Sequence, residues 1–412
     1  RFIIKNRERK LMQILQVHHR FPYLSEEGEV MGIEGGQERH VYEVSRRLVR
    51  RGHKVTVITS NFSSGSNRVD RDEEWIDGIH VIREPGHLVE LPPSGIVIPN
   101  FLKRLIDIEC DLIHAHSTFT QPTELASLAS RLKRIPFVYT PHSQFYWGFH
   151  TDSERRLRRI YESTFLQVLF NLATTIVAVS PMEKETLSDE YGVDPDKIHI
   201  IPTGIAPNQL QEEANFSQTL KKHGIPLDYR YILFLGLLDQ RKGPLYAAKA
   251  FKIVHEKHPE THLVLVGRKR DQYHETVKFV KENSLQDHIT IVGFVTDPER
   301  NSFLSHATVN VLPSSYEAFG MSLAESLYLG TPVVASLSGG VSYVVRHGID
   351  GFLFRASERE NSELIAQYIC QILEDPDLAL KMGNNGRERV NQLFTWEAVL
   401  DQIESLYTSV LE

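Results

Sequence analysis

Two glutamates, Glu317 and Glu325, stand eight positions apart in a segment whose residue types suit the binding of an anion and a ribose. The segment follows an apolar run that is typical of a buried strand, and Gly320 precedes a helical pattern. Eight positions are about two helical turns, so both carboxylates can face one side. A helix N-terminus offers backbone N–H groups to an anion, and a carboxylate two turns on can accept hydrogen bonds from ribose hydroxyls. Many solvent-exposed helices carry two glutamates at this spacing, so the pair alone decides nothing.

Short apolar runs alternate with helical patterns along the whole chain, which indicates parallel sheets covered on both faces. The runs of the first set are Leu11–Val17, Lys54–Thr59, His80–Arg83, Leu112–His116, Phe137–Thr140 and Thr175–Val179. Those of the second set are Tyr231–Leu235, His262–Val266, Ile289–Val292, Val309–Leu312 and Pro332–Ala335. Gly36–Arg51 is predicted as a helix closed by Gly52, and the stretch before Val179 as a buried helix from Phe165.

The length of 412 residues is about twice that of a usual single domain. The polar stretch 206–228 separates the two sets of strands and is predicted as a linker. We therefore expect an α/β protein with two doubly wound Rossmann-like domains, 1–205 and 229–394, facing one another across a cleft. Ligands of such sheets bind at the carboxyl ends of the strands.

Together with Gly330-Thr-Pro-Val-Val-Ala after it, the Glu317–Glu325 segment resembles the Glu-x7-Glu signature of family 4 retaining glycosyltransferases, which have the GT-B fold. The resemblance covers nearly the whole chain. The other segments that resemble the family are Gly32–His40, Asp111–His116, Tyr139–His142, Val177–Ser180, Ile200–Gly204 and Thr395–Tyr407. The last of them, within 395–412, resembles the family's terminal helix, which crosses back to the first domain.

The resemblance implies transfer of a hexosyl group from a nucleotide diphosphate sugar to a hydroxyl acceptor by a front-face mechanism. The acceptor would be a glycan such as one of the cell envelope, a lipid-linked sugar, or a small polyol or phosphate. The resemblance implies that no cofactor or metal is required, and we expect no Asp-x-Asp or His/Cys group of this sequence to supply a metal site.

The resemblance implies roles for the matching positions of this chain. Glu317 would contact donor sugar hydroxyls, Glu325 the ribose, and Lys242 the departing diphosphate, whose charge grows in the transition state. His142 would bind a sugar hydroxyl on the acceptor side, although a histidine after a strand is more often structural. The backbone groups expected to assist belong to Phe319, Gly320 and Met321, with Gly35 and Gly36 from the first domain.

One departure from the family pattern concerns the diphosphate. Leu237 stands where the family usually has an arginine that grips the diphosphate together with the lysine. Our hypothesis is that Arg241 or Arg268 restores the second positive charge.

The acceptor is expected against the first domain. His116 is a weaker candidate than His142, and we expect His114, on the same strand, to point to the opposite face. Arg155 and Arg156 begin a run with four arginines in five positions. Such a run is usually a solvated face; the sharper interpretation is a phosphate-bearing acceptor or an anionic bilayer surface.

Composition narrows the classes of protein to which the chain can belong. A net charge of −7 and a pI of about 6.3 argue against nucleic-acid binding. Two cysteines are too few for a disulfide framework, Arg1–Lys10 lacks a secretory signal, and no run is long enough to span a membrane. We expect a cytoplasmic protein that can lie at the inner face of the membrane.

Two alternatives stay open. A phosphorylase or synthase of related fold would use free phosphate or a glycan primer. A sugar-nucleotide-binding protein without catalysis is suggested by Leu237. A dinucleotide oxidoreductase is disfavoured, because no Gly-x-Gly-x-x-Gly follows the first strand.

Overall fold

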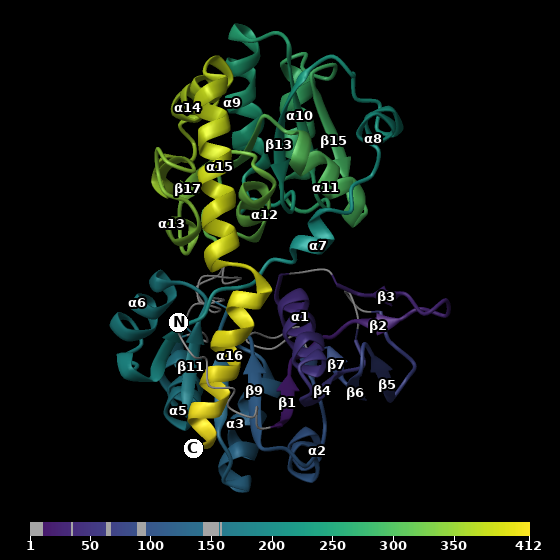
Figure 1. The fold of residues 1–412 in the computed structure, drawn as a ribbon, viewed down its shortest axis with the longest axis vertical. Helices are drawn as coiled ribbons and strands as arrows, with labels where there is room; N and C mark the ends of the chain where they lie inside the picture. The colour runs from purple at the N-terminus through teal and green to yellow at the C-terminus, as the bar shows by residue number, and fades with distance from the viewer. Residues whose placement is uncertain (1–10, 34–35, 63–66, 89–95, 143–155, 157–158) are drawn as a thin grey trace, which may run out of the picture. The chain divides into compact units, whose positions relative to one another are not determined.

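The computed structural model describes residues 11–33, 36–62, 67–88, 96–142, 156 and 159–412. It divides into two compact units, Arg1–Ile201 with Leu400–Glu412, and Pro202–Val399. Each unit is an α/β structure around one large sheet (Figure 1).

The first unit contains an eight-stranded sheet with the order β12-β11-β10-β9-β1-β4-β6-β5, in which the edge pair β5–β6 is antiparallel. Its strands are β1 (Gln13–Val17), β4 (Lys54–Ser60), β5 (Glu73–Ile76), β6 (Ile79–Glu84), β9 (Leu112–His116), β10 (Phe137–Thr140), β11 (Thr175–Ala178) and β12 (Ile198–Ile200). All six strands predicted for this half are present. The prediction missed β5 and β12, because the first is a half-exposed edge strand and the second has only three residues. Two short pairs stand apart from this sheet, β2 (Tyr23–Leu24) with β3 (Val30–Met31), and β7 (His87–Leu88) with β8 (Ile96–Val97).

The α-helices that the structure describes in the first unit are α1 (Gly36–Arg50), α2 (Phe101–Asp107), α3 (Gln121–Lys133), α5 (Gln167–Leu172) and α6 (Pro181–Asp189). A π-helical segment, Glu162–Leu166, leads directly into α5. The helix predicted to start at Gly36 is confirmed to within one residue. The expectation of a fully buried helix from Phe165 was wrong on one face. Phe165 and Val168 are 60% and 55% exposed, whereas Leu169 and Phe170 are buried, so this segment is amphipathic.

The last helix, α16 (Trp396–Leu411), contributes its residues from Leu400 onward to the first unit. The hydroxyl of Tyr407 is 2.5 Å from His114 Nδ1 and accepts a hydrogen bond from Gln16 Nε2 at 3.2 Å. This buried network ties the end of the chain to β1 and β9.

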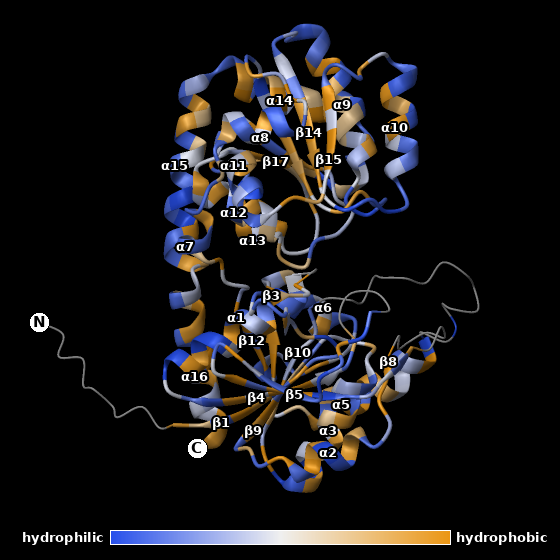
Figure 2. Ribbon diagram, turned by 90° about the vertical axis from the view of Figure 1, so that its right-hand side faces the viewer, coloured by the Kyte–Doolittle hydropathy of each residue, from blue (hydrophilic) through white to orange (hydrophobic). Residues whose placement is uncertain are grey.

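The second unit contains a fully parallel six-stranded sheet with the order β15-β14-β13-β16-β17-β18. Its strands are β13 (Arg230–Leu235), β14 (Thr261–Val266), β15 (Ile289–Gly293), β16 (Val309–Leu312), β17 (Val333–Leu337) and β18 (Gly351–Arg355). The five strands predicted here are present, and β18 was missed. The strands of both sheets are largely apolar, as expected of parallel strands that are covered on both faces (Figure 2).

The helices of the second unit are α7 (Pro207–Leu210), α8 (Phe216–Lys222), α9 (Pro244–Lys257), α10 (Tyr273–Glu282), α11 (Asp297–His306), α12 (Met321–Leu329), α13 (Val341–Val344), α14 (Ser362–Glu374) and α15 (Pro376–Leu393). The segment 206–228, predicted as a linker, differs from that expectation. It forms α7 and α8, which contact α11, and Leu220 and Ile225 are buried in the core. The units divide after Ile201 and after Val399. The otherwise polar segment 206–228 belongs to the second unit, because Leu220 and Ile225 pack into the core of that unit.

Candidate active site

The strand order of the second sheet reverses between β13 and β16, so the loops that follow these two strands meet at one edge of the sheet. The loop after β13 carries Arg241 and Lys242 and leads into α9. The loop after β16 carries Glu317 and leads into α12. The topology thus brings together residues about 75 positions apart.

Glu317 is held between two cations. Its carboxylate is 6% exposed, and its Oε1 lies 2.5 Å from Lys242 Nζ and 3.8 Å from Arg241 Nη1. The backbone N–H of Lys242 donates to Asp239 Oδ1 at 2.8 Å, and Arg241 Nη1 donates to the Tyr316 carbonyl at 3.2 Å. Burial lowers the pKa of Lys242, and the nearby Glu317 carboxylate opposes that shift. Charges in such a buried environment, where the effective dielectric constant is low, interact more strongly than they do in water.

A glycine turn fixes the main chain of Glu317. Gly339 has φ 53°, and a Cβ on it would lie 2.0 Å from the Glu317 carbonyl oxygen. The backbone N–H of Gly340 donates to the same oxygen at 2.8 Å. The Gly339-Gly340 turn therefore approaches the end of β16 closely, and the contact requires a residue without a side chain.

The start of α12 is adjacent to Glu317 in sequence. Gly320 precedes the helix with φ 100°, and Met321 is its first residue. Phe319 is buried and packs edge-on against Phe394, with ring centroids 5.3 Å apart. Glu325, about one turn into the helix from Met321, is 7% exposed, and its Oε1 is 3.6 Å from Arg300 Nη2 of α11.

The two arginines considered for the second positive charge lie in different surroundings. Arg241 faces Glu317, as described above. The guanidinium of Arg268 lies 4.6 Å from the ring centre of Phe294, which is 67% exposed. The geometry therefore favours Arg241 as the partner of Lys242.

The first unit gathers six histidines at the corresponding place, where its strand order reverses between β1 and β9. Five of them lie on or just after β1, β9 and β10, and one lies on α1. These histidines are His18, His19, His40, His114, His116 and His142. The sequence showed no cluster, because these residues are spread over more than 120 positions.

His116 and His142 are in direct contact. His116 Nδ1 lies 3.3 Å from His142 Nε2, and His116 Nε2 lies 2.7 Å from Gln16 Oε1. His116 is fully buried, whereas His142 retains 7% exposure. Burial lowers the pKa of both rings well below the usual range, so both are neutral.

The expectation that His114 points away from His116 was wrong. Residues two apart on a strand share a face, and the two ring centroids lie 4.1 Å apart. His114 makes its own contacts, through Nδ1 to the Tyr407 hydroxyl and through Nε2 to Thr140 Oγ1 at 2.8 Å.

The backbone at these strand ends is unusual. Ser117, Phe119 and His142 adopt φ of 75°, 58° and 56°, in the left-handed region that side chains other than glycine seldom occupy. Such conformations are concentrated at functional sites. All three follow two neighbouring strands, β9 and β10, at the edge of the sheet where the histidines lie.

The positions of the other predicted site residues say little about their proposed roles. Gly36 is the first residue of α1, and a Cβ on it would meet nothing within 4 Å. Arg156 is exposed. Gly35 and Arg155 lie outside the described residues. Among the described helices, none is both apolar enough and long enough to cross a membrane.

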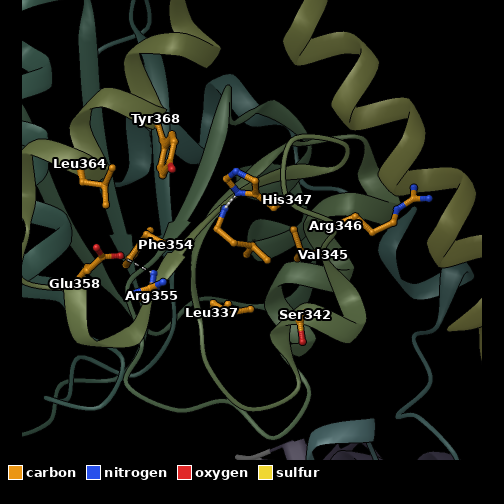
Figure 3. Close-up of a pocket in the computed structure, with 11 residues that line it drawn as sticks. Leu337, Ser342, Val345, Arg346, His347, Phe354, Arg355, Glu358, Leu364 and Tyr368 are labelled. Atoms are coloured by element: carbon orange, nitrogen blue, oxygen red, sulfur yellow. Dashed lines mark hydrogen bonds between the residues drawn. The ribbon is translucent and has the colours of Figure 1, made fainter.

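A pocket of about 480 Å³ opens elsewhere in the second unit, beside β17, β18 and α14 (Figure 3). Two of its lining groups are engaged locally, because the Leu353 N–H donates to His347 Nδ1 and the Arg355 N–H donates to Glu358 Oε2. Its described lining contains none of the predicted site residues.

Solved structures of similar fold define the class of protein. They include a glycosyltransferase from Rickettsia africae ESF-5, with a TM-score of 0.75, 23% identity and coverage of 98% of this chain and 99% of that chain. Sucrose-phosphate synthase from Thermosynechococcus elongatus has a TM-score of 0.73 and 26% identity, covering 97% and 98%. HepE from Anabaena, in complex with UDP and glucose, has a TM-score of 0.74 and 21% identity, covering 97% and 100%. The chain has the GT-B fold of glycosyltransferases.

Sequence comparisons give the family. The family model described as Glycosyltransferase Family 4 matches residues 34–209, and the one described as Glycosyl transferases group 1 matches residues 215–389. The chain belongs to glycosyltransferase family 4, as its motifs predicted. Mannosylfructose-phosphate synthase of Agrobacterium fabrum is 24% identical over 90% of this chain and 86% of its own length. D-inositol 3-phosphate glycosyltransferase of Corynebacterium aurimucosum is 26% identical over 92% of each.

Proposed function

We propose that this glycosyltransferase moves a hexosyl group from a nucleotide diphosphate sugar to a hydroxyl acceptor with retention of configuration. The observation that carries the proposal is the buried Glu317 carboxylate between Lys242 and Arg241, beside the first turn of α12. Two cations and a helix N-terminus around one point form a binding place for a diphosphate.

In this proposal the bound donor replaces the ion pairs of Glu317 with Lys242 and Arg241. Its diphosphate takes Lys242 and Arg241, and the released Glu317 carboxylate accepts hydrogen bonds from hydroxyls of the donor sugar. As the bond between the anomeric carbon and the phosphate oxygen breaks, negative charge grows on the diphosphate. The two cations and the amides of Phe319, Gly320 and Met321 stabilise that charge. The acceptor hydroxyl attacks from the same face, and its proton passes to the departing phosphate oxygen.

The chemistry of the donor is supported by relatives and by Glu325. HepE has been solved with UDP and with UDP-glucose, and we assign a nucleotide diphosphate sugar to this chain as well. Glu325, buried on α12, would accept hydrogen bonds from the ribose. Since Lys242 and Arg241 supply the positive charge, the transfer needs no metal or other cofactor.

We assign a phosphate-bearing small polyol or sugar as the first acceptor class to test. The names of mannosylfructose-phosphate synthase, D-inositol 3-phosphate glycosyltransferase and sucrose-phosphate synthase all include a phosphate. In this proposal His142 binds a sugar hydroxyl. His116 positions His142, because its own ring is fully buried and bonded to Gln16. Arg155 and Arg156 would attract the acceptor phosphate or an anionic lipid surface of the inner membrane face.

A donor screen tests the proposal. Thermal shifts with a panel of nucleotide diphosphate sugars identify the donor, because a bound ligand raises the melting temperature by mass action. We expect Lys242→Met and Arg241→Met each to lower kcat/KM by about 100-fold, as for the loss of one charge-stabilising group. Arg268→Met is the matched control, since it removes an equal charge whose guanidinium lies over the ring of Phe294, and less than about a 3-fold change is expected within the normal spread of surface changes. Equal losses in Arg241→Met and Arg268→Met would contradict the assignment.

The product decides the remaining points. NMR of the product is expected to show the anomeric configuration of the donor, and an inverted product would overturn the front-face mechanism. Transfer to free phosphate would identify a phosphorylase. Donor binding without hydrolysis or transfer across an acceptor panel would identify a binding protein.

A further inference from the structure

The histidine cluster of the first unit has a geometry that the transfer reaction does not require. Three of its rings, from α1, from the end of β9 and from the loop after β10, converge on one point. These are His40, His116 and His142, all buried, and one ring nitrogen of each lies within 4.8 Å of those of the other two. We propose that His40, His116 and His142 bind a divalent transition-metal ion of the Zn²⁺ type.

The distances fit a tetrahedral ion. Bonds of about 2.0–2.1 Å from Zn²⁺ to imidazole nitrogens place two such nitrogens about 3.3 Å apart. His116 Nδ1 and His142 Nε2 are 3.3 Å apart. The same geometry places the ring centres about 5 Å apart, and the observed separations are 4.9 Å for His40–His142, 5.5 Å for His116–His142 and 5.8 Å for His40–His116. A small rotation of the His40 side chain would complete the third bond.

Hydrogen bonds orient one of the ligands. Gln16 Nε2 donates to the Tyr407 hydroxyl at 3.2 Å, so Gln16 Oε1 faces His116 and accepts from its Nε2–H at 2.7 Å. The proton of His116 is therefore on Nε2, and the lone pair of Nδ1 points at His142. Partners of this kind fix the tautomer of metal-binding histidines. The ring of His142 then carries its own proton on Nδ1 when Nε2 binds the ion, and no proton is gained or lost overall.

The neighbouring histidines are excluded by their own contacts. His18 has Nε2 at 3.0 Å from Ser117 Oγ and Nδ1 at 2.5 Å from the Arg20 carbonyl. Both nitrogens of His114 are also engaged, with Tyr407 and Thr140. His19 does not belong to the group whose ring nitrogens converge, which is made of His40, His116 and His142. Three imidazoles suit Zn²⁺ or Co²⁺ and disfavour Mg²⁺ and Ca²⁺, which prefer oxygen ligands.

Metal binding would oppose the transfer reaction, and this consequence rests on the proposed function. In the metal-free protein His142 Nε2–H faces the lone pair of His116 Nδ1, so Nδ1 of His142 is the nitrogen that would accept a hydrogen bond from a sugar hydroxyl. An ion on His142 Nε2 leaves the ring proton on Nδ1, which can then no longer accept that hydrogen bond. The occupied protein would therefore transfer sugar poorly, so that a free transition metal acts as an inhibitor.

The binding experiment uses Co²⁺ as a spectroscopic probe on the full chain. A second group of potential ligands, His258, Cys370 and Glu374, lies in the other unit, so the titration is carried out in a Cys370→Ser background. We expect one Co²⁺ per chain, with the intense visible bands of tetrahedral cobalt. His40→Phe keeps the ring volume and removes the nitrogens, and we expect at least a 100-fold loss of affinity. The absence of these bands, or bands of equal strength in His40→Phe, would overturn the site.

Separate control experiments test whether the variants fold and whether the metal affects sugar transfer. If His40→Phe fails to fold by circular dichroism, Gln16→Met replaces it, and the expected loss of affinity is then about 10–100-fold, as for other outer partners of metal ligands. Unchanged affinity in Gln16→Met would contradict the proposed orientation of His116. Inhibition of transfer by Zn²⁺ is measured as the ratio of rates with and without a chelator. Co²⁺ binding without inhibition would refute the role of His142 and leave the metal site standing, whereas activity without Co²⁺ binding would refute the metal site alone.

Discussion

The turn at Gly339 provides a sharp test of how this fold positions Glu317. In Gly339→Ala the new Cβ would lie 2.0 Å from the Glu317 carbonyl oxygen, and real Cβ contacts essentially never fall below 3.0 Å. The difference of about 1 Å (3.0 − 2.0 Å) must be taken up by the turn or by the Glu317 main chain. A displacement of about 1 Å at a reacting group can cost about 100-fold in rate. The left-handed φ of 53° adds about 1–2 kcal/mol of instability on its own.

Gly348→Ala separates the two effects. Gly348 lies in the same unit with a similar φ of 73°, but a Cβ on it would meet nothing within 4 Å. We expect Gly348→Ala to lose about 1–2 kcal/mol of stability with kcat nearly unchanged. Gly339→Ala should lose at least as much stability and about 100-fold in kcat. The assays are urea unfolding and initial rates with the donor found by thermal shift. Equal kcat in the two variants would refute the idea that this turn positions Glu317.

Two further predictions concern stability. Burial raises the pKa of Glu299, but hydrogen bonds from Lys222 and Thr296 outweigh burial and hold that pKa at about 2, below the ordinary 4.5. The stabilising charge is therefore present above about pH 4.5 and is lost as the pH falls toward 2. Glu299→Gln should cost about 1–2 kcal/mol at pH 7, allowing for solvent screening of the exposed Lys222. In urea unfolding, the difference in unfolding free energy between the wild type and Glu299→Gln should therefore shrink as the pH falls from about 4.5 toward 2. A difference that stays constant over this range would contradict the prediction. Tyr407→Phe deletes a buried hydroxyl that contacts His114 and should lower stability by about 1–3 kcal/mol; an unchanged urea midpoint would show that the contact does not tie α16 to the first unit.

Secondary structure was largely predictable because it depends on neighbours in the chain. Apolar runs identified all eleven strands that were predicted, and the glycines around the helix from Gly36 marked its ends to within one residue. Edge strands such as β5 escaped, since their alternating exposure gives no continuous apolar run. The short segment around Leu220 was taken for a linker, because two buried apolar residues are too few to stand out among polar ones.

The sequence by itself determined the family, since the Glu317–Glu325 motif and the glycine-rich segments are contiguous and each carries its own local geometry. Tertiary structure alone placed Arg241 next to Glu317. Arg241 and Arg268 lie on different loops, and only the reversal of strand order between β13 and β16 places one of them next to Glu317. Tertiary structure also brought together His40, His116 and His142, because contacts between distant residues depend on strand register and packing, which no local pattern records.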